Sequence, residues 1–367
     1  MKFKNQIIRV AAIIVLSLFA AACTEDDKKE VTRLPTTMGY LNANAGKYSI
    51  LVDALKKTGL DTQLEAGGSF TIFAPSNSSF TAAGLSSASI NALAQPVDAV
   101  AIANLRVILL NHLMGVGTRS TDLLAAGYSK TLGFFRSNAP LPVVGQTGII
   151  TANNANLMSI FINKVGADVL LNGGVANGGA KVLAADIESS NSIIHEIDAV
   201  LTLPTLVNHL VANPNLSSLV GVVTSAPQAA VLGVINTATN SSARTVFAPS
   251  NAAFTVATGT NGFLVGKTTA DITKILQYHY LGGAGARLRA FFTPAAPPAT
   301  PVDFFFANTA TTPMQTFGVT TVGALGNRIE DNAVAPRSKV ARFVTIDIVC
   351  VNGIIHIIDK VLEPTLP

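Results

Sequence analysis

The stretch Phe73-Ala-Pro-Ser-Asn-Ser-Ser-Phe80 decides the fold, because it returns later in the chain as Phe247-Ala-Pro-Ser-Asn-Ala-Ala-Phe254. A second motif behaves in the same way: Asn191-Ser-Ile-Ile-His-Glu-Ile-Asp-Ala-Val-Leu201 returns as Asn352-Gly-Ile-Ile-His-Ile-Ile-Asp-Lys-Val-Leu362. The two motifs keep their order in both copies. The chain therefore contains two homologous units. The distance between the copies indicates tandem globular domains, because solenoid repeats are only about 20–50 residues long.

A third, shorter repeated segment lies between the two motifs, where Asn111-His112-Leu113 corresponds to Tyr278-His279-Tyr280. The first unit closes with a short segment that ends at Pro204, much as the second closes at the end of the chain. We therefore predict one domain over residues 38–204 and a second over residues 205–367. A chain of 367 residues, of which 49% are hydrophobic, has enough apolar material for a packed core in each domain.

The first motif predicts a strand that is followed directly by a helix. Residues 69–74 alternate like a half-buried strand, which ends at Pro75. Ser76 or Asn77 can then cap the helix by accepting a hydrogen bond from its first turn, and Gly84 is placed to stop it. The second copy of the motif predicts the same strand-to-helix turn.

Further helices and a terminal hairpin are predicted in each unit. The apolar periodicity predicts helices over residues 48–59, 98–114 and 270–281. Asn352-Gly353 between two β-branched runs indicates a tight hairpin in which both turn residues tolerate positive φ, whereas Asn191-Ser192 predicts a longer loop in the first unit. Helices combined with antiparallel strands indicate an α+β fold around a β-sandwich.

Together these motifs resemble the fasciclin domain, and the resemblance covers nearly the whole chain after its amino terminus. It implies two wedge-shaped β-sandwiches flanked by helices, in an extracellular and often membrane-anchored protein that contacts cells, matrix or polysaccharide. In some animal members a Tyr-His pair is proposed to contact integrins. Here the pair is complete only at Tyr278-His279, since Asn111 precedes His112 in the first unit. Tyr278, His279 and His112 are therefore candidate binding residues.

The other motif residues are expected to be mainly structural. They are Phe73, Pro75, Asn77, His195 and Asp198 in the first unit and Phe247, Pro249, Asn251, His356 and Asp359 in the second. In a strand, His195 and His356 each share a face with isoleucines, so a core histidine with a backbone partner is expected, and a ligand role is the alternative. His112 and His279 close helices, where the helix dipole favours an imidazolium ion; a helix cap and a binding residue both stay open.

The amino terminus predicts export and a lipid anchor. Three basic residues precede a mostly apolar stretch over residues 10–22, which is too short to span a bilayer as a helix, so residues 1–22 are predicted to be a signal peptide. Cys23 directly follows three alanines. This arrangement resembles the bacterial lipobox, whose cysteine is acylated. An ordinary signal peptide with an incidental cysteine is the alternative.

Residues 23–37 are predicted to be a polar tether between the lipid and the first domain. The acidic run after Cys23 resembles the signal that Bacteroidetes-type bacteria use to send lipoproteins to the outer face of the outer membrane. The lipid anchor therefore implies a membrane partner and an outer-membrane location facing outside. A plain solvated tether is the alternative.

Composition excludes some partners. The chain has 25 Lys and Arg and 21 Asp and Glu. Without the three basic residues of the signal peptide the chain is nearly neutral, so it lacks the excess of positive charge that nucleic-acid binding requires. Trp is absent and only 6% of residues are aromatic, which disfavours a sugar-binding surface built on stacked rings. The second cysteine, Cys350, lies in an apolar run and is expected to be a buried, inert thiol.

The sequence has no catalytic or cofactor-binding motif and no closely spaced set of metal ligands. We therefore expect no enzyme activity, no cofactor and no metal site. The leading hypothesis is non-catalytic adhesion to an extracellular protein or polysaccharide, with the least family-like segment, residues 282–342, as a candidate for specificity. A structural or accessory subunit of an envelope protein complex is the alternative, and a hydrolase with a non-sequential active site is a remote one.

Overall fold

The structure, a computed structural model, describes residues 33–123, 126–134, 157–237, 244–281, 303–308, 315–320 and 328–366. The predicted signal peptide, Cys23 and most of the predicted tether lie outside the described residues, as does much of segment 282–342. Residues Pro35–Pro367 form one compact unit that contains both repeats.

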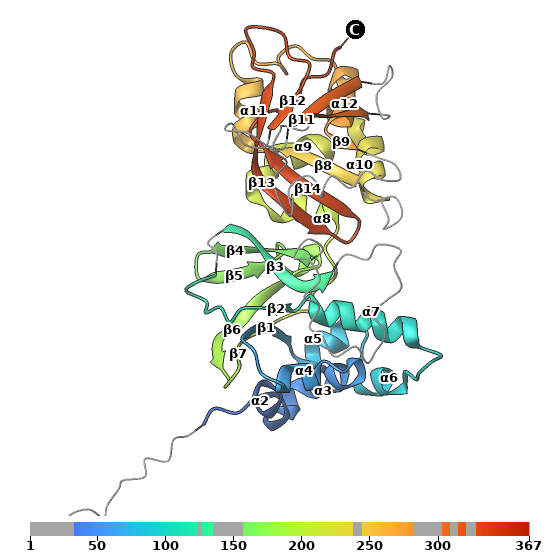
Figure 1. The fold of residues 1–367 in the computed structure, drawn as a ribbon, viewed down its shortest axis with the longest axis vertical. Helices are drawn as coiled ribbons and strands as arrows, with labels where there is room; N and C mark the ends of the chain where they lie inside the picture. The colour runs from blue at the N-terminus through green and yellow to red at the C-terminus, as the bar shows by residue number, and fades with distance from the viewer. Residues whose placement is uncertain are drawn as a thin grey trace, which may run out of the picture. The chain divides into compact units, whose positions relative to one another are not determined.

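The first repeat mixes helices and strands along the chain (Figure 1). Its helices are α2 (Thr37–Ala43), α3 (Ala45–Thr58), α4 (Asp61–Glu65), α5 (Asn77–Ala82), α6 (Ser87–Ala92), α7 (Ala99–Leu110) and the 3-10 turn η2 (Val175–Asn177). Its strands are β1 (Phe70–Pro75), β2 (Leu113–Met114), β3 (Ala126–Phe134), β4 (Leu157–Val165), β5 (Asp168–Leu171), β6 (Ala180–Glu188) and β7 (Ser192–Ile197).

The second repeat follows the same plan. Its helices are α8 (Leu206–Ala212), η3 (Pro214–Leu216), α9 (Ser217–Val223), η4 (Ala226–Gln228), α10 (Ala229–Asn236), α11 (Asn251–Thr258) and α12 (Thr269–Tyr278). Its strands are β8 (Arg244–Pro249), β9 (Tyr280–Leu281), β10 (Asp303–Asn308), β11 (Gln315–Thr320), β12 (Arg328–Glu330), β13 (Val340–Cys350) and β14 (Gly353–Ile358).

Some helix ends follow the predicted signals, whereas α7 and α12 end three or four residues earlier than predicted. Helix α3 ends at Gly59, which adopts the left-handed conformation (φ 66°) that glycine accepts without steric penalty. Helix α5 is capped by Ser76, whose hydroxyl accepts a hydrogen bond from an N–H of the first turn. Helix α7 stops at Leu110, earlier than predicted, because Leu113 and Met114 pair with β1 instead.

Among the described residues, each repeat contains a seven-stranded sheet, in the orders β2-β1-β7-β6-β5-β4-β3 and β10-β11-β12-β13-β14-β8-β9. Most neighbouring strands are antiparallel, as predicted, but the strands of the two long motifs are parallel. A parallel pair needs a long crossover, and the stretch of chain between the motifs supplies it. The two motifs are therefore neighbours in space, with Phe73 opposite His195 and Phe247 opposite His356.

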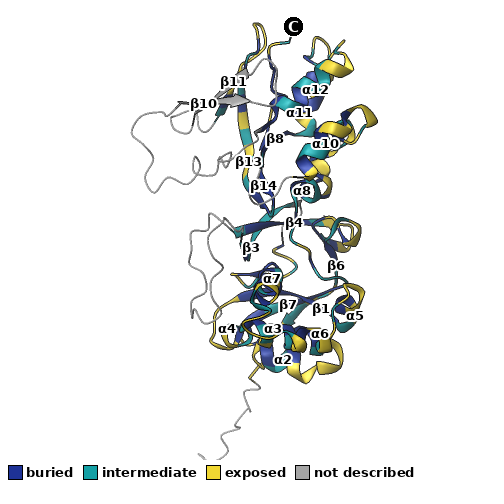
Figure 2. Ribbon diagram, turned by 90° about the vertical axis from the view of Figure 1, so that its right-hand side faces the viewer, coloured by how far each residue is buried: buried dark blue, intermediate teal, exposed yellow. Residues whose placement is uncertain are grey.

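Two apolar layers cover opposite faces of the motif strands. In the first repeat, Ile72 and Ile194 pack with the helices, whereas Phe73 and Ile197 pack with residues of β4 and β5. The second repeat is divided in the same way. Every residue of β1 and β14 is buried (Figure 2). A layer of helices against two sheet halves confirms the α+β class and the β-sandwich.

The hairpin of the second repeat is present, but the prediction for its turn is wrong. Cys350 pairs with Gly353, so the turn consists of the two residues between them, and Gly353 opens β14. A Cβ atom on Gly353 would lie 2.3 Å from the carbonyl oxygen of Arg244. Glycine is thus needed for the close approach of β8, not for a positive φ. The first repeat has the longer loop that was predicted, with residues 189–191 between β6 and β7.

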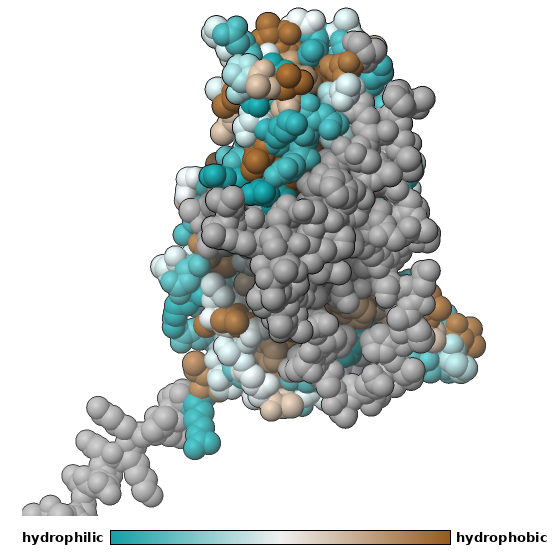
Figure 3. Space-filling view, turned by 45° about the horizontal axis from the view of Figure 1, so that its top comes forward, coloured by the Kyte–Doolittle hydropathy of each residue, from teal (hydrophilic) through white to brown (hydrophobic). Residues whose placement is uncertain are grey.

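Apolar side chains on the described surface are scattered. On the face drawn in Figure 3, apolar residues (brown) form small separate groups between neutral and hydrophilic ones. The most exposed are single valines such as Val97 (87%) and Val256 (76%). Within the part of the chain that the structure describes, no single helix is long and apolar enough to cross a bilayer; Pro214–Val223 and Ala226–Asn236 meet the criterion only jointly, with an 80° bend between them.

Candidate functional site

A phenylalanine and a histidine from the two long motifs form a buried stack in each repeat. Phe73 and His195 lie opposite each other, with 5.7 Å between ring centroids and 28° between ring planes. Phe247 and His356 repeat this stack at 5.9 Å and 25°. All four side chains are 0% exposed. The paired motifs therefore encode a core contact that joins two strands.

Each stacked histidine also holds a bulge in the adjacent strand. His195 Nδ1 accepts a hydrogen bond from the N–H of Asp186 at 3.3 Å, and His356 Nδ1 accepts one from Asp347 at 3.1 Å. Both aspartates have left-handed backbones (φ 60° and 57°) where the strand register shifts. A bulge leaves a backbone group outside the ladder, and the imidazole satisfies it. The other ring nitrogen of His195 donates to the carbonyl oxygen of Thr118 at 2.9 Å.

The helix-end histidines His112 and His279 are cross-links in the core. Each Nδ1–H donates to the carbonyl oxygen four residues earlier, at 2.8 and 2.7 Å. Each Nε2 accepts the N–H of a residue near the end of its repeat, Leu201 (2.9 Å) or Leu362 (2.8 Å). Burial lowers the pKa of both imidazoles to about 4. The prediction that His112 and His279 are favoured as imidazolium ions is therefore wrong, because the cost of burying the charge outweighs the helix dipole.

The residue before each of these histidines is buried as well. The hydroxyl of Tyr278 accepts a hydrogen bond from Asn332 Nδ2 at 3.3 Å. Asn111, at the same place in the first repeat, donates to the carbonyl oxygen of Thr202 at 3.1 Å and accepts from Thr131 Oγ1 at 3.0 Å. None of the three candidate binding residues is more than 4% exposed, and their contacts are those of structural residues. Their role in binding stays a prediction.

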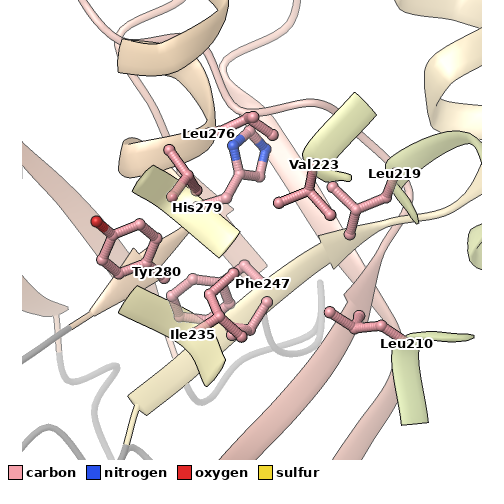
Figure 4. Close-up of a pocket in the computed structure, with 10 residues that line it drawn as sticks. Leu210, Leu219, Val223, Ile235, Phe247, Leu276, His279 and Tyr280 are labelled. Atoms are coloured by element: carbon pink, nitrogen blue, oxygen red, sulfur yellow. The ribbon is translucent and has the colours of Figure 1, made fainter. Parts of the chain in front are cut away.

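His279 also borders a small apolar cavity inside the second repeat (Figure 4). Side chains from helices α8, α9, α10 and α12 and from strands β8 and β9 line it. Phe247 and Tyr280 lie on the strand side of this cavity (Figure 4). Its volume is about 20 Å³. That is room for roughly one water molecule, so this cavity is too small for a ligand.

The motif asparagines bind the preceding helix at matching points. Asn77 Oδ1 accepts the N–H of Ile50 at 3.0 Å, and its Nδ2 donates to the carbonyl oxygen of Gly46 at 3.2 Å. Asn251 makes the same two contacts, at 2.9 Å each, with the N–H of Ser218 in α9 and the carbonyl oxygen of Pro214 in η3. The two backbone groups are four residues apart, the pair that a regular α-helix joins to each other. The amide therefore ties the helix to the motif turn.

Replacing Asn77 by alanine is expected to lower the free energy of unfolding by about 2 kcal/mol. The change removes three hydrogen bonds, the third to Ser49 Oγ at 3.0 Å, and takes away the side-chain acceptor of Ile50 N–H. Asn251→Ala should have an effect of the same size. Urea unfolding followed by circular dichroism measures both. Asn91→Ala, at an exposed position of α6, is the control and should change stability by less than about 0.5 kcal/mol; an equal loss in Asn77→Ala and the control would contradict the assignment.

The ends of the second motif satisfy further backbone donors. Asp198 Oδ1 and Asp359 Oδ1 each accept an N–H of the neighbouring strand at 2.7 Å. Asn191 Oδ1 and Asn352 Oδ1 accept the first N–H of helices α2 and α8, at 3.0 and 2.8 Å. Helix and strand ends leave such groups without partners of their own. The polar residues of the motifs thus hold the fold together.

Contacts between the two repeats use residues outside the motifs. Lys130 Nζ on β3 donates to the carbonyl oxygen of Asp347 at 2.5 Å, and Ser159 Oγ on β4 accepts a backbone N–H of β13 at 2.9 Å. The buried ring of His209, on α8, meets Tyr128 edge-on, with 5.4 Å between centroids. These residues could not be identified from the sequence, because they belong to no repeated motif and contacts between the repeats join positions far apart in the chain.

A second, larger cavity opens on the surface of the second repeat, with a volume of about 350 Å³. Helix α11 and the loop after it, segment 337–340 and segment 359–363 form its walls. Asp359 and Glu363 are among its lining residues but no histidine is, so this cavity lacks the convergent histidine and carboxylate groups that a hydrolase site of the remote hypothesis would need.

Two further sequence-based expectations concern metal ligands and the thiol. Within the described residues, no three His, Cys, Asp or Glu side chains are grouped so that they could hold a metal ion. Cys350 is 0% exposed, and burial raises the pKa of its thiol. The thiol is therefore buried, as expected from its apolar neighbours in the sequence.

Comparison with known proteins agrees with the duplicated architecture. The fasciclin-domain family model matches residues 46–204 and residues 214–364. Among solved structures, the chain is similar to a FAS1 domain pair from the insect cell adhesion molecule fasciclin I. The sequence identity is 16%, over 87% of this chain and 95% of that chain, and the TM-score is 0.43. The two family matches together take in well over half of the chain.

Proposed function

Because the chain belongs to the fasciclin family, with two domains of that family in tandem, we propose that it is a lipid-anchored adhesion protein of the bacterial outer membrane. It faces outside, binds an extracellular protein or polysaccharide and catalyses no reaction. Fasciclin domains are associated with cell adhesion and binding. The observation that carries the proposal is the duplicated fasciclin domain, which follows a predicted signal peptide (residues 1–22) and Cys23.

The environment of the motif residues supports binding over catalysis. A catalytic acid, base or nucleophile must reach its substrate, at least through one water molecule. The motif histidines His112, His195, His279 and His356 are all buried. The hydrogen bonds of their rings and of the motif Asn and Asp side chains go largely to backbone groups of the same repeat. Ligand contacts are therefore expected from surface residues other than the buried motif histidines, which is typical of a binding module whose scaffold is constant and whose loops vary.

Cys23→Ser is expected to abolish acylation and to release the protein from the membrane fraction, because serine offers no thiol for the thioether-linked lipid. Metabolic labelling with a fatty acid, followed by fractionation of the cells, measures both. Cys350→Ala is the matched control: Cys350 is the other cysteine of the chain, is fully buried, and should leave the labelling unchanged. If the Cys23→Ser protein is still labelled or still sediments with membranes, the prediction of a lipid anchor at Cys23 is wrong.

The same strains test adhesion. Protease treatment of intact cells reports whether the protein faces outside.

The adhesion test compares cell attachment. Wild-type cells should attach to a matrix- or polysaccharide-coated surface better than Cys23→Ser cells, since a protein released from the membrane cannot attach a cell to a surface. Wild-type attachment no better than that of a deletion strain would overturn adhesion. Recovery of the protein with a partner in fixed stoichiometry, in cells without an adhesion defect, would favour the accessory-subunit alternative instead.

A further inference from the structure

The open cavity of the second repeat has the size of a small-ligand site. Its volume is about 350 Å³, at the lower end of the roughly 300–1,000 Å³ that ligand pockets occupy. Three segments far apart in the chain meet there: α11 with its following loop, residues 337–340 and residues 359–363. The cavity is therefore a product of the folded repeat.

One wall contains an ionic network around two buried carboxylates. The carboxylate of Glu363 accepts a hydrogen bond from Arg337 Nε at 2.7 Å and forms an ion pair with Lys360 Nζ at 3.2 Å. Lys360 also pairs with Asp331, whose carboxylate accepts the N–H of Glu363 at 2.9 Å. The side chains of Glu363 and Asp331 are 4% and 0% exposed. Such a network keeps the polar groups of the wall in place before a ligand arrives, which reduces the entropy lost on binding.

Phe263 lines the cavity, but cations flank its ring. Lys267 Nζ lies 5.0 Å and Arg337 Cζ 5.6 Å from the ring centroid, both over the ring. These are cation–π contacts. A ligand that required stacking on this ring would have to displace them. Recognition is thus expected to rely on hydrogen bonds and on aliphatic contact.

The lining suits a neutral, hydroxyl-rich ligand. Its charged groups are balanced, with Arg337 and Lys360 against Asp359 and Glu363, so the lining does not select a strongly charged ligand. The lining also holds the uncharged polar residues Thr260, Asn261 and Ser338 together with the aliphatic residues Val256, Ala257, Val340 and Val361. A sugar ring presents the complementary pattern, because its hydroxyl groups donate and accept while its C–H faces are apolar.

The first repeat lacks the residues that make this wall. In the alignment of the two long motifs, Lys360 corresponds to Ala199, and Glu363 corresponds to Thr202. Neither residue of the first repeat can form the ion pairs of the second. The duplicated domains therefore differ at this place in charge and hydrogen-bonding groups, as expected when one copy carries a ligand site.

We propose that this cavity of the second repeat binds a neutral mono- or disaccharide unit of an extracellular polysaccharide. The proposal rests on the adhesion function and names its ligand class and site. Val256 lines the cavity on α11 and is 76% exposed, so a larger side chain there reaches the cavity without burial in the core. Asn261 lines it from a left-handed backbone (φ 63°) that glycine also adopts.

The test uses the full mature lipoprotein, purified in detergent, and a panel of neutral hexose disaccharides and polysaccharides, uronate-containing counterparts and acidic peptides. Binding is measured by calorimetry and by saturation-transfer NMR. Val256→Trp and Asn261→Gly should each weaken binding of a neutral saccharide at least about ten-fold. The matched control is Val100→Trp, because Val100 is also an exposed helical valine (65%) but lies in the first repeat; it should bind like wild type.

The outcomes separate this proposal from the adhesion function. Saccharide binding that is equal in Val256→Trp and wild type, or no binding of any neutral saccharide, overturns the cavity proposal. Preferential binding of uronates or acidic peptides overturns its ligand class. Cells carrying Val256→Trp that attach as well as wild-type cells would refute the cavity while leaving adhesion intact, whereas wild-type cells that do not attach at all would refute adhesion itself.

Discussion

Lowering the pH from 7.5 to 5 is expected to remove most or all of the protein's stability. The chain has five histidines, and all of them are buried: His112, His195, His209, His279 and His356. Burial lowers the pKa of each from the ordinary 6.5, to about 4 for His112 and His279 and to about 3 for His209 and His356. The neutral rings fit the core, and the charged rings do not.

Proton linkage determines whether stability rises or falls with pH. The native pKa values lie below those of the unfolded chain, so between about pH 6.5 and pH 4 the unfolded chain binds more protons. Stability is therefore fully present above pH 6.5 and is lost as the pH falls. At pH 5 each histidine with a pKa of about 3 or 4 removes about 2 kcal/mol, and four of them remove about 8 kcal/mol. Total stabilities of proteins are only about 5–15 kcal/mol.

Urea unfolding between pH 5 and pH 8, followed by circular dichroism, measures this loss. A His112→Gln variant is the control, because its amide can still donate and accept hydrogen bonds but cannot take up a proton. Its stability at pH 8 is expected to be lower than that of wild type, whereas its loss between pH 7 and pH 5 should be about 2 kcal/mol smaller. Calorimetry can also measure directly, on the wild-type protein, how many protons are taken up on unfolding. A stability that is flat between pH 5 and pH 7 would contradict the neutral, buried state of the histidines.

Removing Lys360 from the ionic network around the buried carboxylates of Asp331 and Glu363 should have the second large effect. Lys360→Met leaves Asp331 (side chain 0% exposed) without its lysine and Glu363 (4% exposed) with only Arg337. Burial already raises the pKa of Asp331, and Lys360 is the main group that opposes this rise. An uncompensated buried carboxylate is costly, so we expect the free energy of unfolding at pH 7 to fall by about 3–5 kcal/mol.

The control for this change is Lys181→Met in the first repeat. Lys181 pairs with Asp168 at 2.8 Å, but these two side chains are 40% and 50% exposed. Exposed ion pairs contribute roughly 0–1 kcal/mol, so the control should lose less than about 1 kcal/mol. Adding Asp331→Asn to Lys360→Met should recover part of the loss, because the amide needs no counter-ion. Similar losses in Lys360→Met and Lys181→Met would mean that the network contributes no more than a surface pair.

Much of the fold could be predicted because its signals are local. A strand that ends at Pro75, a hydroxyl cap at Ser76 and a left-handed Gly59 depend on residues a few positions apart. The repetition of these signals in the same order was enough to predict two copies of an α+β domain. Predictions that required knowledge of distant neighbours were less accurate. Gly353 was assigned to a turn, although it lies at a strand start where only glycine leaves room for β8.

The sequence by itself determined the duplication, the family resemblance, the approximate positions of helices α3, α5, α7, α11 and α12 and which motif residues matter for the fold. Only the tertiary structure decided their electrostatics and their surroundings. It joins the two long motifs as parallel strands, buries the helix-end histidines as neutral rings and brings residues 253–263, 337–340 and 359–363 around one cavity. The physical reason is that capping and periodicity act between near neighbours in the chain. Desolvation, ion pairing and cavity shape depend on segments that meet only after folding.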